Sequence, residues 1–430
     1  MKTASCRERL EQALARISDP TGEGARACLT VYAERGRAEA DAADARTRNG
    51  TSLGPLDGRV VSIKDLFDVA GEPTRAGSKL LIDAPPAEQD APPVRRLRRA
   101  GAVIVAKTNM TEFAFSGVGA NPHFGTPGNP ADRSRVPGGS SSGAAVAVAD
   151  GMCEIGIGTD TGGSTRIPAA LCGVVGFKPS QWRIPRDGAF PLSFSLDSIG
   201  PIARTVADCA IADAVMANDE PETVRPADPA GLRFAAPKST AWLAWDDQVG
   251  RAFETALGRI GKAGVRLSDA PLPILEEMMA ANAKGGLAPA EAFAIHRDRM
   301  RDHADLIDPN VRFRIARGEK MSAADYVQLT RERARLIKAM DDWLAAYDAM
   351  ILPTTPIVAP KMSEVDTADA FSPKNMALLS NANPMNFFDL CAISLPLRSE
   401  ALPVGLMLVA RNGHDRRLFE IAAAMERVLS

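Results

Sequence analysis

The sequence has few cysteines, and they lie far apart. No two of the six in this chain of 430 residues have the C-x-x-C spacing of redox and zinc sites: Cys6, Cys28, Cys153, Cys172, Cys209 and Cys391. The pattern argues against a disulfide-stapled secreted fold and is typical of a reduced environment. We therefore expect buried thiols, no metal site and a cytoplasmic location.

The chain also lacks an excess of charge and a long apolar run. Its 51 Lys and Arg against 53 Asp and Glu give a net charge of −2. No run reaches the ~18 apolar residues that span a membrane, and residues 1–19 lack the apolar segment of a signal peptide. These absences predict neither a nucleic-acid partner nor a membrane partner, and no export.

Histidines and aromatic residues are scarce too. Aromatic residues make up 5% of the chain, too few to indicate a binding pocket. The histidines number four: His123, His296, His303 and His414. Two stand in a charged helical stretch and one begins the last predicted helix, so surface or capping roles suit them. The remaining one, His123 in a loop, is the hardest to dismiss, but none makes a convincing general base.

Short apolar runs alternate with amphipathic stretches, which indicates an α/β fold with a buried parallel or mixed sheet. Helices are expected at 7–17, 25–48, 93–100, 144–149, 204–216, 248–264 and 414–429. Strands are expected at 60–63, 103–106, 155–158, 174–177, 232–236, 265–267, 349–352 and 404–409. The pattern is mainly helical over 272–347, while 116–142 reads as loop and the Pro-rich segment 217–231 as a linker. Length alone would favour two or three domains.

One stretch, residues 138–179, is dense in glycine and serine. Three consecutive serines follow Gly138-Gly139, and Ser164 follows Gly162-Gly163. Glycine pairs let backbone N–H groups approach a ligand, because no Cβ intervenes. A serine after such a turn can attack a carbonyl while the neighbouring amides hold the developing oxyanion. An ordinary glycine-serine turn is the alternative for Ser164.

The earlier serines allow other interpretations. The PGGSSSG segment around Ser140 could be a flexible or anion-binding turn, but it is no P-loop, because no lysine follows. The window 139–143 matches G-x-S-x-G centred on Ser141, a nucleophile elbow that requires a preceding strand. The residues before it, NPADRSRVPGG, do not read as a strand.

A serine nucleophile needs a base, and Lys64 is the best candidate. It closes the apolar run VVSIK, so its amine could be held away from water. Desolvation lowers the pKa of a lysine from about 10.4 towards neutrality, where it can accept a proton. A surface charge, or a pair with Asp65 or Asp68, is the alternative.

Separate segments of the chain resemble one family, the amidase signature family of serine amidohydrolases. They are GPLDGRVVSIKDLFDVAG at 54–71, GAVIVAKTNMTEFA at 101–114, the stretch 138–179 and SLDSIGPIAR at 195–204, with a looser match for PVGLMLVA at 403–410. The resemblance is specific, because glycines, serines and lysine occur in the family's order and Ser164 lies 24 residues after Ser140. One departure is visible: Ser142 stands where the family usually has glycine.

The resemblance implies a role for each matching residue. Ser164 would be the nucleophile and Lys64 the base, with Ser140, after a cis peptide bond, relaying the proton between them. The oxyanion loop would comprise Thr161, Gly162 and Gly163. Supporting positions would be Ser141, Asp160 and Arg166. No metal and no cofactor would be needed.

The resemblance also implies a fold and a function. The fold would be one α/β domain over 1–430, a mixed sheet flanked by helices, with a signature core at about 55–210 and a variable C-terminal half at about 230–430. The function would be hydrolysis of a small-molecule carboxamide to acid plus ammonia or amine, by a protein that could form a homodimer. A partner-bound protein similar to the A subunit of glutamyl-tRNA amidotransferase, or an inactive binding protein, is the alternative. Pocket segments are expected near 121–124, 192–194 and 383–388.

Overall fold

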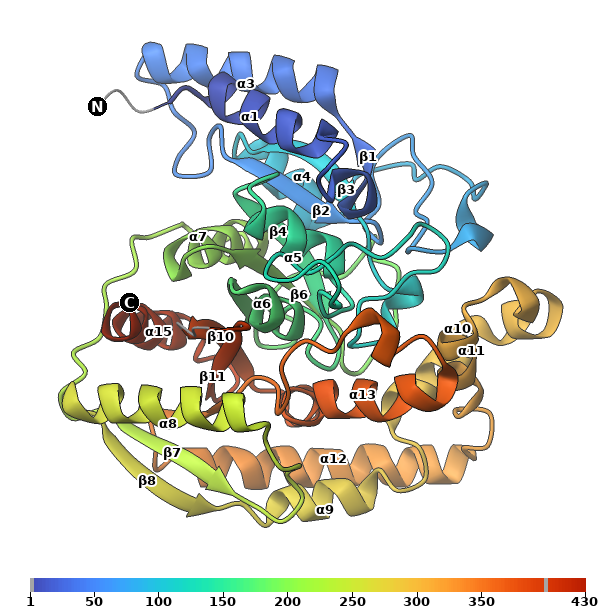
Figure 1. Ribbon diagram of the computed structural model, residues 1–430, viewed down its shortest axis with the longest axis vertical. Helices are drawn as coiled ribbons and strands as arrows, with labels where there is room; N and C mark the ends of the chain where they lie inside the picture. Colours follow the sequence, from blue (N-terminus) through green and yellow to red (C-terminus); the bar gives the residue numbers. More distant parts are fainter. Residues whose placement is uncertain (1–3, 398–400) are drawn as a thin grey trace.

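The apolar runs of the sequence pair into one sheet of eleven strands, in the order β1-β3-β2-β4-β6-β5-β10-β11-β9-β7-β8 (Figure 1). The computed structural model describes residues 4–397 and 401–430. The strands are β1 Cys28–Val31, β2 Val60–Lys64, β3 Val103–Thr108, β4 Ile155–Asp160, β5 Val175–Lys178, β6 Ser198–Ala203, β7 Arg233–Lys238, β8 Arg266–Pro271, β9 Ala349–Pro353, β10 Cys391–Leu397 and β11 Val404–Ala410. This architecture confirms the predicted α/β fold with a mixed sheet.

The sheet is mixed and buried on both faces. Strand β2 runs parallel to β3 and β4, and β7 runs parallel to β8 and β9, whereas the remaining pairs are antiparallel. Every residue of β2, β3, β4, β6, β9 and β11 is buried. Strands covered on both faces need apolar side chains at successive positions, which explains the continuous runs in the sequence.

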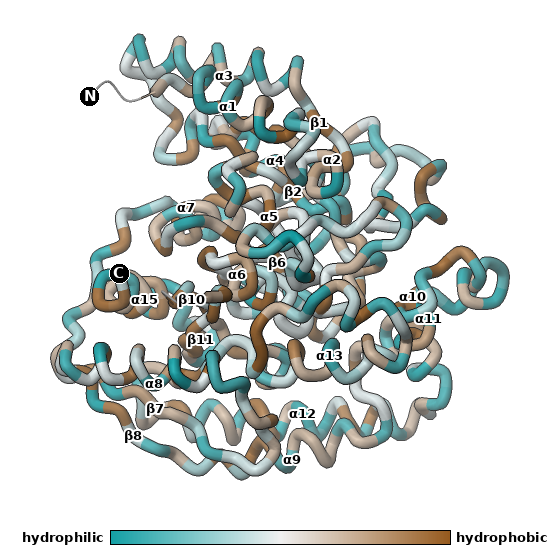
Figure 2. Tube along the Cα trace, in the orientation of Figure 1, coloured by the Kyte–Doolittle hydropathy of each residue, from teal (hydrophilic) through white to brown (hydrophobic). Residues whose placement is uncertain are grey.

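Helices cover the two faces. The α-helices are α1 Cys6–Ser18, α2 Gly24–Ala27, α3 Ala33–Arg48, α4 Pro92–Arg99, α5 Ser142–Ala149, α6 Arg166–Cys172, α7 Val206–Ala217, α8 Asp247–Lys262, α9 Ile274–Ala281, α10 Leu287–Asp302, α11 Pro309–Ala316, α12 Ala323–Leu344, α13 Ala368–Ser380, α14 Asn383–Phe387 and α15 Asp415–Leu429. Short 3-10 turns occur at η1 Lys79–Leu81, η2 Glu112–Ala114, η3 Ala304–Leu306 and η4 Met362–Glu364. Hydrophobic residues concentrate around β10 and β11, whereas α3 is largely hydrophilic (Figure 2).

The alternation along β9 shows how the core is divided. Ala349 and Ile351 belong to the large hydrophobic cluster that includes residues of α4, α7, α8 and α15. Met350 and Leu352 point to the opposite face and belong to a separate cluster with residues of α9, α12 and α14. A two-residue period of this kind places successive side chains on opposite faces of a sheet.

Parts of the predicted secondary structure are wrong. The range 25–48 is not one helix, because β1 Cys28–Val31 separates α2 from α3 and pairs antiparallel with β3 at the sheet edge. Strands β6 and β10 were not predicted at all. Both contain proline, Pro201 and Pro396, which normally argues against a central strand. Tertiary pairing on both sides outweighs this local preference.

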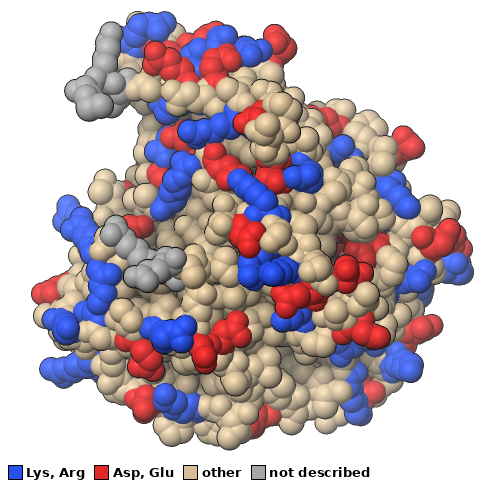
Figure 3. All heavy atoms as spheres, viewed as in Figure 1, with Lys and Arg blue, Asp and Glu red and all other residues tan. Residues whose placement is uncertain are grey.

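Three further features concern the cysteines, the absence of membrane-spanning helices and the surface charge. The six cysteines are buried and unpaired, as predicted. No helix within 4–397 or 401–430 has the length and apolar character needed to cross a membrane. Acidic and basic side chains intermingle on the face shown in Figure 3. Glu11 of α1 forms an ion pair with Arg7 in the same helix and another with Arg37 of α3.

Candidate active site

The site forms where parallel strands β2 and β4 end at the same edge of the sheet. Ile63 of β2 is in register with Ile157 of β4, so Lys64 and the loop that follows Asp160 emerge side by side. The N-terminus of α5 and the serines before it complete this edge: the Ser141 N–H donates to the Ser164 carbonyl at 3.2 Å. The topology therefore brings residues 64, 140 and 164 into one region. In open α/β sheets, the carboxyl ends of parallel strands are the usual place for ligands.

Lys64 lies against hydroxyl groups rather than a carboxylate. Its Nζ is 2.8 Å from Ser140 Oγ and 2.8 Å from Thr159 Oγ1, and the side chain is completely buried. Neither alternative for Lys64 applies, because it is not a surface charge and makes no ion pair with Asp65 or Asp68 in the described chain. Burial lowers the pKa of Lys64 to about 7, although Asp160 and Asp197 oppose the shift. At neutral pH a large fraction of this amine is therefore uncharged.

Asp160 organises the loop of residues 160–166. Its carboxylate accepts hydrogen bonds from the Gly163 N–H at 2.8 Å and the Thr165 N–H at 3.1 Å, and it pairs with the Arg166 guanidinium at 2.9 Å. Burial alone would raise the pKa of Asp160, but the charge and hydrogen bonds of Arg166 hold it well below its usual range. A fully buried ion pair with this many donors fixes the loop backbone.

Asn386 of α14 joins this cluster. Its side-chain N–H groups donate to the Asp160 carbonyl at 3.0 Å and to Asp160 Oδ1 at 2.9 Å, and its Oδ1 accepts from Arg166 at 2.7 Å. The sequence predicted the range 383–388 only as pocket wall, so this supporting role was missed. The C-terminal half thus helps to hold the glycine loop in place.

The backbone N–H groups of the loop 160–166 differ in whether they make a hydrogen bond. In the described chain, no hydrogen bond is found from the N–H groups of Thr161, Gly162 or Ser164, whereas that of Gly163 is taken by Asp160. Thr161 is fixed by its side chain, whose Oγ1 donates to Asp197 Oδ1 at 2.6 Å. Free donors are therefore available on both sides of Gly163, but Gly163 itself is occupied.

The remaining serines of the stretch, Ser140, Ser141 and Ser142, lie at the start of α5. The Gly139–Ser140 peptide bond is cis. Ser141 and Ser142 are buried; the hydroxyl of Ser141 donates to the Thr159 carbonyl at 3.4 Å, and that of Ser142 has no partner within the described residues. The nucleophile-elbow interpretation of Ser141 is wrong, because its side chain is enclosed and a loop, not a strand, precedes it.

The histidines do not take part in the site, but one prediction about them fails. His296 was expected at the surface or at a cap, yet it is completely buried against Phe113 at a centroid distance of 4.2 Å. Burial lowers its pKa to about 3, so the ring is neutral at physiological pH. His414 stands at the start of α15 and His303 at the end of α10, as predicted.

Ser164 opens into a cavity of about 510 Å³. Ser164 itself is 4% exposed, and Thr161 and Gly162 line the same space. The distal wall comes from the C-terminal half and is mostly apolar, with Leu275, Met278, Leu287, Met376, Leu379 and Phe387. The predicted wall segments 192–194 and 383–388 do contribute. The prediction for 121–124 is wrong, because Asn121 instead donates to the Gly77 and Met110 carbonyls, holding the loop.

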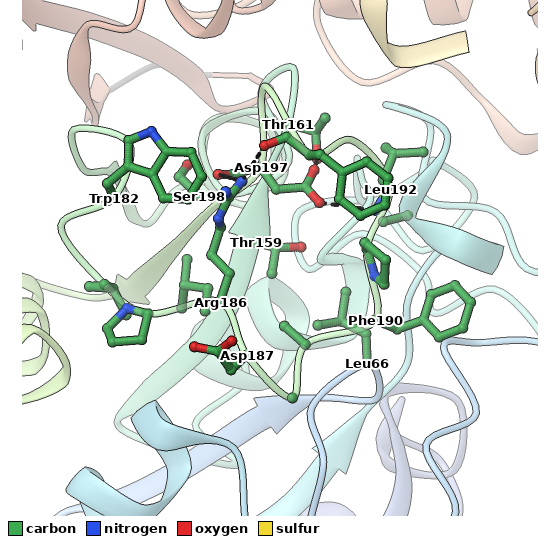
Figure 4. Close-up of a pocket in the computed structure, with 18 residues that line it drawn as sticks. Leu66, Thr159, Thr161, Trp182, Arg186, Asp187, Phe190, Leu192, Asp197 and Ser198 are labelled. Carbon is green, nitrogen blue, oxygen red and sulfur yellow. Dashed lines mark hydrogen bonds between the residues drawn. The ribbon is translucent and has the colours of Figure 1, made fainter. Parts of the chain in front are cut away.

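A second cavity of about 390 Å³ lies on the other side of the loop (Figure 4). It shares Ala114, Thr161 and Leu192 with the first cavity, and Thr159, a hydrogen-bond partner of Lys64, lines it. Figure 4 shows Arg186 extending toward Asp197, beside Trp182; the guanidinium carbon is 4.0 Å from the indole centroid. The loop thus lies between two cavities. One cavity reaches Ser164, and the other reaches Thr159, which contacts Lys64.

Comparisons with known proteins identify the family of this chain. The family model described as Amidase matches residues 8–419. The chain is 37% identical over 406 residues to 2-amino-5-chloromuconic acid deaminase of Comamonas testosteroni. The aligned region covers 92% of this chain and 87% of that protein. It is 36% identical over 469 aligned residues to the A subunit of glutamyl-tRNA(Gln) amidotransferase of Anaeromyxobacter sp. (strain K), covering 100% of this chain and 94% of that one.

Solved structures show the same fold. A crystal structure of an amidase superposes with a TM-score of 0.88 at 33% identity, over 99% of this chain and 97% of that one. The native peptide amidase from Stenotrophomonas maltophilia gives a TM-score of 0.80 at 28% identity, over 99% of this chain and 94% of that one. The chain therefore belongs to the amidase signature family, hydrolases that act on C–N bonds.

Proposed function

We propose that this chain hydrolyses a carboxamide to a carboxylic acid and ammonia or an amine, through a covalent acyl intermediate on Ser164. The observation that carries the proposal is the buried contact of 2.8 Å between Lys64 Nζ and Ser140 Oγ, beside the loop that presents Ser164 to the cavity. An amine with a pKa of about 7 is a suitable proton acceptor at neutral pH.

The proton path runs through two serines. Neutral Lys64 accepts a proton from the Ser140 hydroxyl, which in turn accepts one from Ser164 as its Oγ attacks the amide carbonyl carbon. The C–N bond then breaks, and the proton returns through Ser140 to the leaving nitrogen. Protonation matters because an amide anion is a very poor leaving group. Water hydrolyses the acyl-serine by the same relay and restores the free enzyme.

The oxyanion is held by the backbone of the loop. Because Asp160 already engages the Gly163 N–H, the free N–H groups of Thr161, Gly162 and Ser164 are the donors we assign to this role. Donors fixed before the reaction stabilise developing charge without reorganising, and each contributes about 3–4 kcal/mol to lowering the barrier. Asp160, Arg166 and Asn386 act indirectly by holding this backbone, and Ser141 does so through its N–H to the Ser164 carbonyl.

The alternative is a subunit that passes ammonia to a partner protein. Identity does not separate the two functions, because the deaminase is 37% identical to the chain and the amidotransferase protein 36%. We expect the chain purified alone to release ammonia or amine from one or more members of a panel of alkyl, aryl and carboxylated amides. Ammonia and product acid are measured together by coupled assay and mass spectrometry. Turnover that occurs only after a partner protein is added would favour the alternative.

The pH dependence should report Lys64. The pKa of its amine is lowered by burial to about 7, and only the neutral form accepts a proton, so kcat/KM should be constant above about pH 8. Below about pH 6 we expect it to fall about tenfold for each pH unit, as Lys64 becomes protonated. Initial rates from pH 5 to 9 measure this profile. A rate that is independent of pH over this range would exclude Lys64 as the base.

A further inference from the structure

A buried glutamate of the C-terminal half reaches the surroundings of the oxyanion loop. Glu291 lies on α10, one turn after residues 287–289, which line the cavity that contains Ser164. The glutamate is only 4% exposed, and among the described residues it lines neither of the two cavities beside the loop. No step of the proposed reaction uses this carboxylate.

The Glu291 carboxylate accepts hydrogen bonds from two neighbouring parts of the chain. Its Oε2 accepts from Ser193 Oγ and, at 3.0 Å, from the Ser195 N–H. Its Oε1 accepts from Ser195 Oγ at 2.5 Å and from the Tyr326 hydroxyl on α12 at 2.7 Å. A carboxylate has about four lone-pair sites, so these four donors use its acceptor capacity in full. Both oxygens are therefore fixed, and they join α10 and α12 to residues 193 and 195.

The segment that Glu291 holds, residues 192–197, lies between the two cavities. Leu192 lines both of them, Leu196 lines the cavity that contains Ser164, and Asp197 lines the other. A shift of this segment would therefore change the walls of both cavities at once.

Asp197, at the end of this segment, connects it to the oxyanion loop (Figure 4). Its Oδ1 accepts from Thr161 Oγ1 at 2.6 Å. Its Oδ2 accepts from the N–H groups of Leu192 at 3.0 Å and Ser193 at 3.1 Å. Because the Ser193 hydroxyl binds Glu291, a continuous path of hydrogen bonds runs from Glu291 through the segment to Thr161.

The end of this path is one of the proposed oxyanion donors. The Thr161 N–H makes no hydrogen bond in the described chain, so its position depends on the contacts of the neighbouring atoms, among them the side-chain contact with Asp197. An oxyanion donor is effective only when it is in place before the charge develops, and a displacement of about 1 Å can lower a rate about 100-fold.

We propose, on the basis of the hydrolase function above, that Glu291 is a positioning residue for the reaction. It holds residues 192–197 in place, and Asp197 in turn fixes Thr161 so that its N–H can bind the oxyanion. A side chain of the C-terminal half thereby supports the chemistry at Ser164 without touching the substrate.

The test compares two replacements of Glu291 that separate its length from its charge. Glu291→Asp keeps the charge but is one methylene shorter, so its carboxylate cannot reach all four donors. Glu291→Gln keeps the length: its amide oxygen accepts from the Ser195 N–H, and its NH2 group donates to the hydroxyls of Ser195 and Tyr326, which can also act as acceptors. A positioning role therefore predicts a loss in Glu291→Asp and retention in Glu291→Gln.

The measurement is the rate constant at which a fluorophosphonate labels Ser164, together with kcat and KM for an amide that the unchanged chain hydrolyses. Labelling forms an O–P bond, expels fluoride and develops charge on the phosphoryl oxygen, so it depends on the same donors. We expect Glu291→Asp to lower the labelling rate constant and kcat at least about tenfold, with KM within about threefold, and Glu291→Gln to stay within about threefold. Partial unfolding would instead lower the labelled fraction and leave the rate constant unchanged.

A double-mutant cycle tests the path itself. Thr161→Val removes the hydroxyl that binds Asp197. If Glu291 acts through this contact, Glu291→Asp should lower the labelling rate constant much less in the Thr161→Val chain than in the unchanged chain. Losses that multiply in the double variant would overturn the inference.

Glu23→Asp is the matched control. Glu23 is also 4% exposed and accepts from the Gly128 N–H at 2.8 Å, but within the described chain it lines neither cavity, so labelling should stay within about threefold. Equal labelling of Glu291→Asp and the unchanged chain, or an equal loss in Glu291→Gln, would overturn the inference. If the unchanged chain is labelled at Ser164 but hydrolyses no amide, the hydrolase proposal fails, and the labelling comparison still decides the role of Glu291.

Discussion

Replacing Ser164 with alanine is expected to lower kcat by at least about 10⁴-fold, the scale seen when a nucleophile that works as part of a unit is removed. The change deletes one buried oxygen from the loop that Asp160 holds in place, so the fold should persist. A serine-directed fluorophosphonate should add one mass increment to the unchanged chain, located on the peptide that contains Ser164, and none to the variant. Intact-mass spectrometry and the amide assay measure the two effects together.

Ser142→Ala provides the comparison for this experiment. It also removes a buried hydroxyl from the glycine-serine stretch, but this hydroxyl has no hydrogen-bond partner among the described residues. We expect activity within about threefold of the unchanged chain and an unchanged adduct. Full activity of Ser164→Ala, or an adduct on another serine, would remove the assignment of the nucleophile.

The strands that build the site were the easiest part of the fold to predict. Val60–Lys64 and Ile155–Asp160 are buried on both faces, so their composition alone identifies them. Strands β6 and β10 were missed because Pro201 and Pro396 carry the opposite local signal. Strand β1 was missed because its four residues lie between helix-forming stretches. In each case the decisive contacts are with segments far away in sequence.

In the site, too, features set by local sequence could be predicted, whereas features set by distant contacts could not. The serines, the glycine pairs and Lys64 stand out in the sequence because their local patterns are unusual. The role of Asn386 could not be seen, since it depends on α14 packing beside the end of β4, 226 residues earlier in the chain. The engagement of the Gly163 N–H by Asp160 depends on a turn geometry that several sequences could adopt.

Substrate choice is expected to reside in the C-terminal half. The groups assigned to the chemistry come from 64–164, within the segment 55–210 that we propose as the chemical core. The wall facing Ser164 comes from 241–289, 314–317 and 376–387, on α9, α10, α11, α13 and α14. If the residues assigned to catalysis stay the same while the residues of the cavity wall change, one fold can act on different amides.

Lys64→Met is expected to lower kcat/KM by about 10³-fold or more while making the protein more stable. Methionine has a similar length and needs no hydration, so the buried space stays filled. The unchanged lysine has a native pKa of about 7, against about 10.5 in the unfolded chain. Between these values only the unfolded state binds the proton, which costs the unchanged protein stability at pH 7. The variant avoids this cost and should gain about 2–4 kcal/mol in unfolding free energy at that pH.

The pH dependence of this gain separates a base from a structural lysine. As pH rises from 7 to 10, the unfolded chain binds the Lys64 proton less strongly, so the gap between the variant and the unchanged protein should shrink. Denaturant unfolding at several pH values measures the gap. Lys107→Met is the control: this buried lysine of β3 contacts the Pro73 carbonyl at 3.4 Å and does not line either cavity beside the loop, so activity should stay within about tenfold. A desolvated base destabilises the folded state, so its removal should raise stability. If Lys64→Met lowered both activity and stability, Lys64 would instead be a residue that holds the fold together.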